Sequence, residues 1–410
     1  MENTIPIKEH LKSNMFWNMV FSMLNAGQSM ILLIIVNRFA GENASGIFSF
    51  AFSVAVLMMY IGNFGIRNYQ VSDTIEHFSF AEYCGSRIVS CLVMIGVSVG
   101  YVIFHQYDVE KSWIILLLCG MRLVECMEDV IHGRYQQKGR LDLACIQGSI
   151  RIMLSLLAFT FGLWATGNLL QAVCVYTICN LVCFLMLTIC TVGRFGGMQF
   201  SFNRLHLTEM FLDCFPLFCG YFFSTYIGNV SKYAIDRFGS EEMQAYYNMI
   251  FMPVLVINLV STMIFRPVIV HMAELWNTRQ TQAFQGMVKR QLLIIIGLSV
   301  VMLPLMIWIG LPILTLLYGT ELSMFRIPFL ILLSGGVCSA MSSFLNVCII
   351  TIRQQKKLLI VIGVLSVLAA VSGGQLVRIM GMNGAALLYL ILTVLQVAGY
   401  LWIEWIGSKK

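Results

Sequence analysis

Runs of about 20 mostly apolar residues recur along the whole chain, separated by short polar segments. Each run is long enough to cross the hydrocarbon core of a bilayer as a helix. The longest segments between runs cover only about residues 68–85 and 271–288. The pattern predicts an all-α polytopic membrane protein without a soluble domain. We expect about twelve transmembrane helices in this protein, centred near residues 25, 55, 96, 121, 152, 179, 220, 256, 300, 338, 367 and 394.

The first predicted helix interrupts its apolar pattern with regularly spaced amides. In SNMFWNMVFSMLNAGQSM, the side chains of Asn14, Asn18, Asn25 and Gln28 fall within a quarter-turn of one another. A side-chain amide that faces hydrocarbon without a partner costs a few kcal/mol. We therefore expect this stripe to face other helices or a water-filled substrate cavity.

Composition agrees with the hydropathy pattern and adds an orientation. Of the 410 residues, 59% are hydrophobic and 11% are charged, whereas soluble domains are about 25% charged. With the N-terminus inside, seventeen Lys and Arg residues fall in cytoplasmic segments and six in external ones. Because basic residues are retained in the cytoplasmic loops of bacterial-type inner membranes, we expect both termini in the cytoplasm. The net charge of +6 then reflects topology and contact with anionic membrane lipids, and no dense basic patch suggests nucleic acid binding.

Cysteine and histidine positions give no reason to expect a metal centre or a cofactor. All thirteen cysteines fall in predicted helices or near their cytoplasmic ends, which excludes an external disulfide framework. Five of the six histidines lie at the predicted cytoplasmic surface without the spacing of metal ligands. The sequence therefore predicts no metal site.

Two similar segments lie 199 residues apart. IIVNRFAGENASGIFSFAFSV joins the first predicted helix to the second, and KYAIDRFGSEEMQAYYNMIFMPV joins the seventh to the eighth. Alignment of Asn37 with Asp236 also aligns the Arg-Phe pairs that follow and one glutamate in each copy. The repeat predicts two six-helix lobes, residues 1–200 and 201–410, related by an axis along the membrane normal.

These segments also carry a family resemblance. NRFAGENASGIFSFAFSV…IGNFGIRN resembles the helix 1 to helix 2 signature of polysaccharide transporters in the multidrug/oligosaccharidyl-lipid/polysaccharide (MOP) flippase superfamily. AIDRFGSEEMQAYYNMIFMPVLVINLVSTMIFRPVI…ELW is similar to their helix 7 to helix 8 region, and GMNGAALLYLI to their last helix. The resemblance implies twelve helices in two lobes around a central cavity, as in MATE-like transporters. It also implies flipping of an undecaprenyl-diphosphate-linked repeat unit for O-antigen, lipopolysaccharide or capsule synthesis.

Charged residues inside the predicted helices are candidates for a site. Arg122 and Arg151 lie about ten residues into neighbouring helices, so both fall about 15 Å deep in a core of about 30 Å. Glu125 lies one turn from Arg122, and Asp129 follows on the same face. In one interpretation, Arg122 and Glu125 form a pair that holds the helix against its neighbours. In the other, only one carboxylate is close to two arginines, so Arg122 and Arg151 line the cavity and attract a diphosphate.

Two further charged residues lie near helix ends. Asp213 is a lone carboxylate inside the seventh predicted helix, and it and Glu125 are candidates for coupling transport to a proton or sodium gradient. A hydrated carboxylate near the interface is the alternative for Asp213. Arg266 either snorkels to the headgroups or joins the substrate cavity. Small and amide residues of the eighth and tenth helices indicate close packing: Asn258, Gly335, Ser339, Ser342 and Asn346.

These features favour a transporter over an enzyme. The leading hypothesis is a flippase for lipid-linked oligosaccharides that works by alternating access, with other polysaccharide-assembly proteins as further partners. A cation-coupled multidrug exporter of the same superfamily is the alternative, although mid-membrane arginines repel cationic drugs. A membrane polymerase or ligase would need an external catalytic loop, and the predicted external loops are only a few residues long.

The asymmetry of the basic residues makes the topology testable. Reporter fusions near Lys138, Gln285 and Lys410 should report the cytoplasm, and a fusion near Asp236 should report the outside. Alkaline phosphatase and green fluorescent protein measure this, because each is active on one side of the membrane. A cytoplasmic Asp236 would contradict both the orientation and the repeat alignment.

Overall fold

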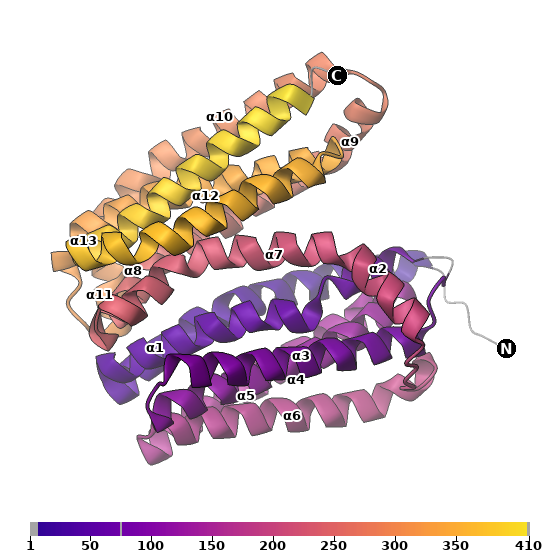
Figure 1. The fold of residues 1–410 in the computed structure, drawn as a ribbon, viewed down its shortest axis with the longest axis horizontal. Coiled ribbons are helices and arrows are strands. Elements are labelled where there is room, and N and C mark those ends of the chain that lie inside the picture. The colour runs from indigo at the N-terminus through magenta and orange to yellow at the C-terminus, as the bar shows by residue number, and fades with distance from the viewer. Residues whose placement is uncertain (1–6, 74–75, 408–410) are drawn as a thin grey trace. The chain divides into compact units, whose positions relative to one another are not determined.

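The computed structural model describes residues 7–73 and 76–407, and the regular structure of these residues is entirely helical (Figure 1). The chain divides into two compact units, Met1–Phe222 and Phe223–Lys410, called here the first and the second unit. Figure 1 shows long helices running side by side within each unit. This confirms the predicted all-α membrane fold.

The first unit is built from six long helices and two short ones. The last of them, α7, continues into the second unit. In chain order the elements are α1 (Ile7–Asn63), α2 (Ile66–Ser72), α3 (Phe80–His105), α4 (Val109–Gln137), α5 (Leu141–Thr166), α6 (Leu169–Val192), the 3-10 turn η1 (Gly193–Phe195) and α7 (Arg204–Phe238).

The second unit adds four long helices to the end of α7, with shorter pieces between them. The elements are α8 (Glu241–Phe265), η2 (Arg266–Val268), α9 (Ile269–Asn277), α10 (Thr281–Leu305), the π-helical turn η3 (Met306–Gly310), α11 (Leu311–Tyr318), η4 (Ser323–Phe325), α12 (Arg326–Thr351) and α13 (Gln355–Gly407).

Two of the helices each supply two membrane spans. Gly41 interrupts α1 with a φ of 84°, and Gly381 interrupts α13 with a φ of 56°, a conformation that glycine adopts without steric penalty. Nine helical segments of the described chain are long and apolar enough to cross a membrane, and these two breaks raise the number of spans to eleven. The twelfth is α4, which is 29 residues long but too charged to count as apolar. Twelve spans agree with the sequence prediction.

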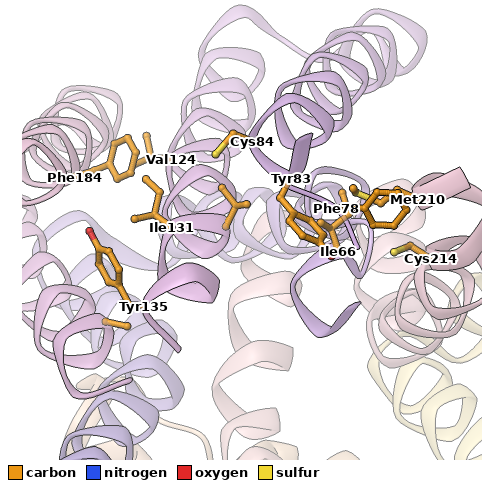
Figure 2. Packing of buried hydrophobic residues seen from close by; sticks show 12 residues of the cluster. Ile66, Phe78, Tyr83, Cys84, Val124, Ile131, Tyr135, Phe184, Met210 and Cys214 are labelled. Atoms are coloured by element: carbon orange, nitrogen blue, oxygen red, sulfur yellow. The ribbon is translucent and has the colours of Figure 1, made fainter. Parts of the chain in front are cut away.

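The charged helix α4 lies at the centre of the first unit. It contacts α1, α2, α3, α5 and α6. Figure 2 shows part of this packing: Val124, Ile131 and Tyr135 of α4 lie in a buried cluster that also includes Phe184 of α6 and Met210 of α7. Lipid tails are as apolar as these side chains, so close packing and polar bonds hold such helices together rather than exclusion of water.

The first half of α7 belongs to the first unit because aromatic side chains bind it there. The ring of Phe64, just after α1, stacks on Phe218 at a centroid distance of 4.5 Å and meets Phe211 edge-on at 5.0 Å. Tyr60 and Tyr221 stack at 5.8 Å. The compact units divide at residue 222, inside α7, and the boundary between two six-helix lobes at residue 200 stays a prediction.

The two copies of the repeated motif both cross a helix junction. The break at Gly41 follows the Asn-Arg-Phe of the first copy, and the residues between α7 and α8 follow the Asp-Arg-Phe of the second. The offset of 199 residues pairs Gly41 with Ser240, which lies between those two helices. The symmetry axis along the membrane normal stays a prediction.

Carboxylates bind the residues just before α3. Asp73 accepts hydrogen bonds from the backbone N–H groups of His77 and Phe78 at 2.8 and 3.0 Å. Glu76 is paired with Arg134 of α4 at 2.9 Å, and the hydrogen bond from Arg134 is the main cause that lowers the pKa of Glu76 below its usual value. The Glu76–Arg134 pair thus joins the residues just before α3 to α4.

A tight contact at Gly85 of α3 predicts that alanine at this position and at Gly96 of the same helix affects protein stability differently. A Cβ at Gly85 would lie 2.0 Å from the backbone oxygen of Ser201, whose N–H is bonded to the carbonyl of Ala81 at 2.9 Å. A Cβ at Gly96 would meet open space. We expect Gly85→Ala to lower the melting temperature in detergent, because the clash is with backbone, at a cost of about 1–3 kcal/mol.

The matched variant Gly96→Ala should leave the melting temperature unchanged or raise it, since alanine is the better helix former. Equal melting temperatures for the two variants would mean that the linker before α7 does not pack on α3 as described.

Candidate functional site

Seven charged residues of the first unit form two neighbouring groups of ion pairs along α4, called here the charge network. Its carboxylates all lie on α4, and its arginines come from four helices. The members are Arg67 of α2, Arg87 of α3, Arg122, Glu125, Glu128 and Asp129 of α4, and Arg151 of α5.

One end of the network joins the two arginines that the sequence placed at equal depth. Arg122 pairs with Glu125 one helical turn away, and Arg151 reaches the same carboxylate at 3.3 Å. Arg151 also pairs with Glu128 at 2.9 Å and donates to Asn180 Oδ1 of α6 at 2.6 Å. The expectation that only one carboxylate lies close to these arginines is therefore wrong, because Glu128 is the second.

This end is electrically balanced and closed to solvent. Arg122 is 6% exposed and Arg151 is 2% exposed. The guanidinium of Arg122 also lies 4.5 Å from the centre of the Phe52 ring of α1. Two cations are matched by two carboxylates here, so the pairing interpretation describes the observed contacts.

The other end of the network carries an excess positive charge. Asp129 accepts from Arg67 Nη1 at 2.8 Å and from Arg87 Nη2 at 2.9 Å, so one carboxylate faces two guanidiniums. Arg87 is fully buried, and its Nη1 also donates to the Gly62 carbonyl at 2.8 Å and to Asn63 Oδ1 at 3.0 Å. The side chain of Arg67 is 29% exposed. Buried Arg87 thus holds Asp129 in place, while Arg67 remains accessible.

Arg67 faces an open polar pocket of about 400 Å³ within the first unit. Its Nη2 donates to Gln136 Oε1 at 3.1 Å, and across the pocket Asn68 Nδ2 donates to the Tyr221 hydroxyl at 2.9 Å. The turn between α1 and α2 puts these residues here, because Gly65 has a φ of 72° and leaves room for Leu217 3.0 Å from its Cβ position. A partly exposed guanidinium with a positive surplus behind it suits an oxyanion with two adjacent oxygens.

A family model described as "Polysaccharide biosynthesis protein" matches residues 11–273, more than half of the chain. The chain belongs to this family. No curated protein matches the sequence significantly.

Solved structures agree on the fold of this member of the polysaccharide biosynthesis family. The lipid II flippase MurJ, in an inward closed conformation, is similar with a TM-score of 0.72 and 12% identity, over 94% of this chain and 87% of that one. A multidrug resistance MATE family transporter of the MOP superfamily, in an inward-facing conformation, is similar with a TM-score of 0.67 and 13% identity, over 95% of each chain. The predicted MOP fold is confirmed.

The amide stripe of this family member is mostly bonded to other helices. Asn14 donates to the Gly139 carbonyl at 3.1 Å and accepts from the Asp142 N–H at 2.7 Å, so it caps the start of α5. Gln28 is buried and donates to the Tyr176 hydroxyl of α6.

The other two amides of the stripe have different surroundings. Asn18 lies 3.9 Å from Cys145 Sγ of α5, and Asn25 is exposed. Three of the four amides thus contact α5, α6 or the turn before α5. Lining of a substrate cavity by these residues stays a prediction.

The two remaining candidates lie apart from the charge network. Asp213 is exposed on α7, with Tyr69 of α2 as a hydrogen-bonding neighbour. Arg266 begins η2, and its side chain lies outside the described part of the structure. No group of three His, Cys, Asp or Glu residues in the described chain is arranged to hold a metal ion.

Sequence reasoning missed Arg67, Arg87 and Glu128. The two arginines were counted with the predicted cytoplasmic segments because they lie near the starts of helices. Glu128 lies next to Asp129, and its partner Arg151 is 23 residues away on another helix. The usable signal was the spacing of Glu125 and Asp129, which marked one charged face of α4 before its partners were known.

The balanced end of the network predicts a charge-dependent stability. Arg151→Gln leaves Glu125 and Glu128 with only Arg122, and an uncompensated buried charge costs about 3–5 kcal/mol. We expect a large loss of folded protein, measured by fluorescence size-exclusion chromatography after heating. The double variant Arg151→Gln/Glu128→Gln restores the balance and should recover part of the loss. If Arg151→Gln alone were as stable as the wild type, the network would not hold these helices together.

Proposed function

We propose that the protein is a flippase that moves an undecaprenyl-diphosphate-linked oligosaccharide repeat unit across the cytoplasmic membrane by alternating access. Membership of the polysaccharide biosynthesis family and the MOP fold support this proposal. The single observation that carries it is the surplus positive charge at Asp129, with Arg67 facing a polar pocket. Every substrate of this class has a diphosphate in common.

In this proposal Arg67 receives the diphosphate. Its Nη1 is held by Asp129, so the guanidinium plane is fixed before the substrate arrives. Its Nη2 is bonded to the neutral amide of Gln136. A phosphate oxygen in place of that amide forms a charge-assisted hydrogen bond, which is about twice as strong as a neutral one. The exchange favours the anion without breaking the pair with Asp129.

Arg122 and Arg151 serve a different purpose in this proposal. Because both are paired and nearly inaccessible, they fix α4 against α1, α5 and α6 and so position Asp129. Direct contact between these two arginines and the diphosphate, coupling to a proton or sodium gradient through Asp213 or Glu125, and contacts with other polysaccharide-assembly proteins stay predictions.

A drug exporter of the same fold is the competing function. Export of cationic drugs is disfavoured by the same surplus charge, because Arg67 and Arg87 outnumber Asp129. The two functions therefore predict opposite responses to a change at Arg67. Removal of its charge weakens binding of a diphosphate and favours a cation.

The test is flipping in proteoliposomes of an undecaprenyl-diphosphate-linked trisaccharide, scored by access of an external lectin to the sugar. Arg67→Gln should slow flipping by about 10- to 100-fold, which corresponds to a charged hydrogen bond of about 1.5–3 kcal/mol. Protein folding should persist, because Asp129 keeps Arg87. Arg67→Lys should retain part of the activity, since the charge remains and the planar fork is lost.

Arg140→Gln is the matched control, because Arg140 is paired with Asp142 at 3.0 Å and does not line the pocket. It should flip the probe at the wild-type rate. A wild-type protein that exports a cationic dye and flips no lipid-linked sugar would overturn the proposal in favour of the drug exporter.

A further inference from the structure

The second unit contains a polar pocket of different chemistry. It has a volume of about 180 Å³, which is room for about six waters. Residues of α7, α12 and α13 line it. Of the described residues that line it, none is charged, and most carry hydroxyl or amide groups.

One wall of the pocket is a regular stripe on α12. Ser339, Ser342 and Asn346 are spaced three or four residues apart, and with Ser343 they share one helix face. The sequence interpreted this face as a packing surface, and that holds for Gly335, whose Cβ position lies 2.7 Å from Tyr389. From Ser339 onward the same face lines the pocket instead.

The opposite wall is a matching stripe on α13. Tyr389, Thr393, Gln396 and Tyr400 again share one face at helical spacing. Gln396 Nε2 donates to the Tyr400 hydroxyl at 2.9 Å, so the amide oxygen of Gln396 and the hydroxyl proton of Tyr400 are not used in that bond. The wall therefore offers both a donor and an acceptor.

Two buried polar atoms of the α12 stripe have no hydrogen-bond partner among the described residues. They are Ser342 Oγ and Asn346 Oδ1. Ser342 is only 3% exposed. Buried polar atoms in proteins are almost always bonded, and an unpaired one lowers stability. A ligand with hydroxyl groups would supply the missing partners.

We propose that this pocket binds one uncharged sugar ring of the transported oligosaccharide. The inference rests on the proposed flippase function and names a second contact for the same substrate. A diphosphate finds no cation among the lining residues, and a metal cation finds no carboxylate. A sugar ring presents several hydroxyls that both donate and accept, as the two stripes do.

The experiment fills the pocket and compares two probes. Gly228 of α7 lines the pocket, and its Cβ position has open space around it, so Gly228→Leu places a side chain there without a backbone clash. Asn346→Ala removes one of the unpaired groups. Binding is measured on purified protein for undecaprenyl-diphosphate-linked N-acetylglucosamine and for undecaprenyl diphosphate without sugar.

Both variants should raise the dissociation constant for the sugar-bearing lipid by about ten-fold, the effect of one or two hydrogen bonds. The dissociation constant for undecaprenyl diphosphate should stay the same. Gly297→Leu is the matched control, because Gly297 is exposed on α10 and its Cβ position also meets open space. It should bind both probes as the wild type does.

Three outcomes would overturn the inference. Unchanged binding of the sugar-bearing lipid by Gly228→Leu and Asn346→Ala would leave the flippase function in place and remove the sugar site. An equal loss for both probes would show that the pocket does not recognise the sugar. A wild-type protein that binds neither probe would remove the proposed function itself, and the inference with it.

Discussion

The arrangement of the first unit depends on the free-energy cost of the charges that α4 carries into the membrane. Three carboxylates and an arginine on one helix are stable in hydrocarbon only if other charged side chains meet them. Arg87 and Arg151 supply those partners from α3 and α5, and both are almost fully buried. Removing one partner of a buried pair is far more costly than removing both. The need to neutralise the buried charges of α4 thus favours α3 and α5 as its neighbours.

Positive and negative charges are equal in number at one end of the network but not at the other. Around Arg151, each guanidinium has its own carboxylate, and the result is a rigid neutral support. At Asp129 the second guanidinium belongs to Arg67, which is the more exposed of the two. Surplus charge at a buried position would be severely destabilising, whereas beside an open polar pocket solvent screens it. The network therefore places its one unmatched charge where an anion from solution has access.

The sequence predicted features that depend on local spacing and missed those that depend on helix packing. Eleven of the twelve spans coincide with apolar segments, and the Arg122–Glu125 pair follows from a separation of three residues. The pairing of Arg87 with Asp129 joins residues 42 positions apart, and Gln28 meets Tyr176 across 148 positions. The spacing of polar residues along a helix identifies its polar face, but it does not identify the helix that packs against that face. For the same reason the α12 face was assigned to packing throughout, although only its first turn packs closely.

The pocket at Arg67 and the pocket lined by α12 and α13 differ in charge, and in the proposed function they have different roles in binding the substrate. A diphosphate is identical in every lipid-linked sugar, so the proposed contact with Arg67 is expected to strengthen binding of all of them equally. Selection among sugars requires buried groups that each match one hydroxyl, because a missing hydroxyl then leaves its partner unpaired. The uncharged stripes of α12 and α13 have that character, and Ser342 and Asn346 already have polar atoms without partners in the described structure. If the proposed roles hold, a change of sugar preference arises from these stripes, whereas a change at Asp129 alters transport of every substrate alike.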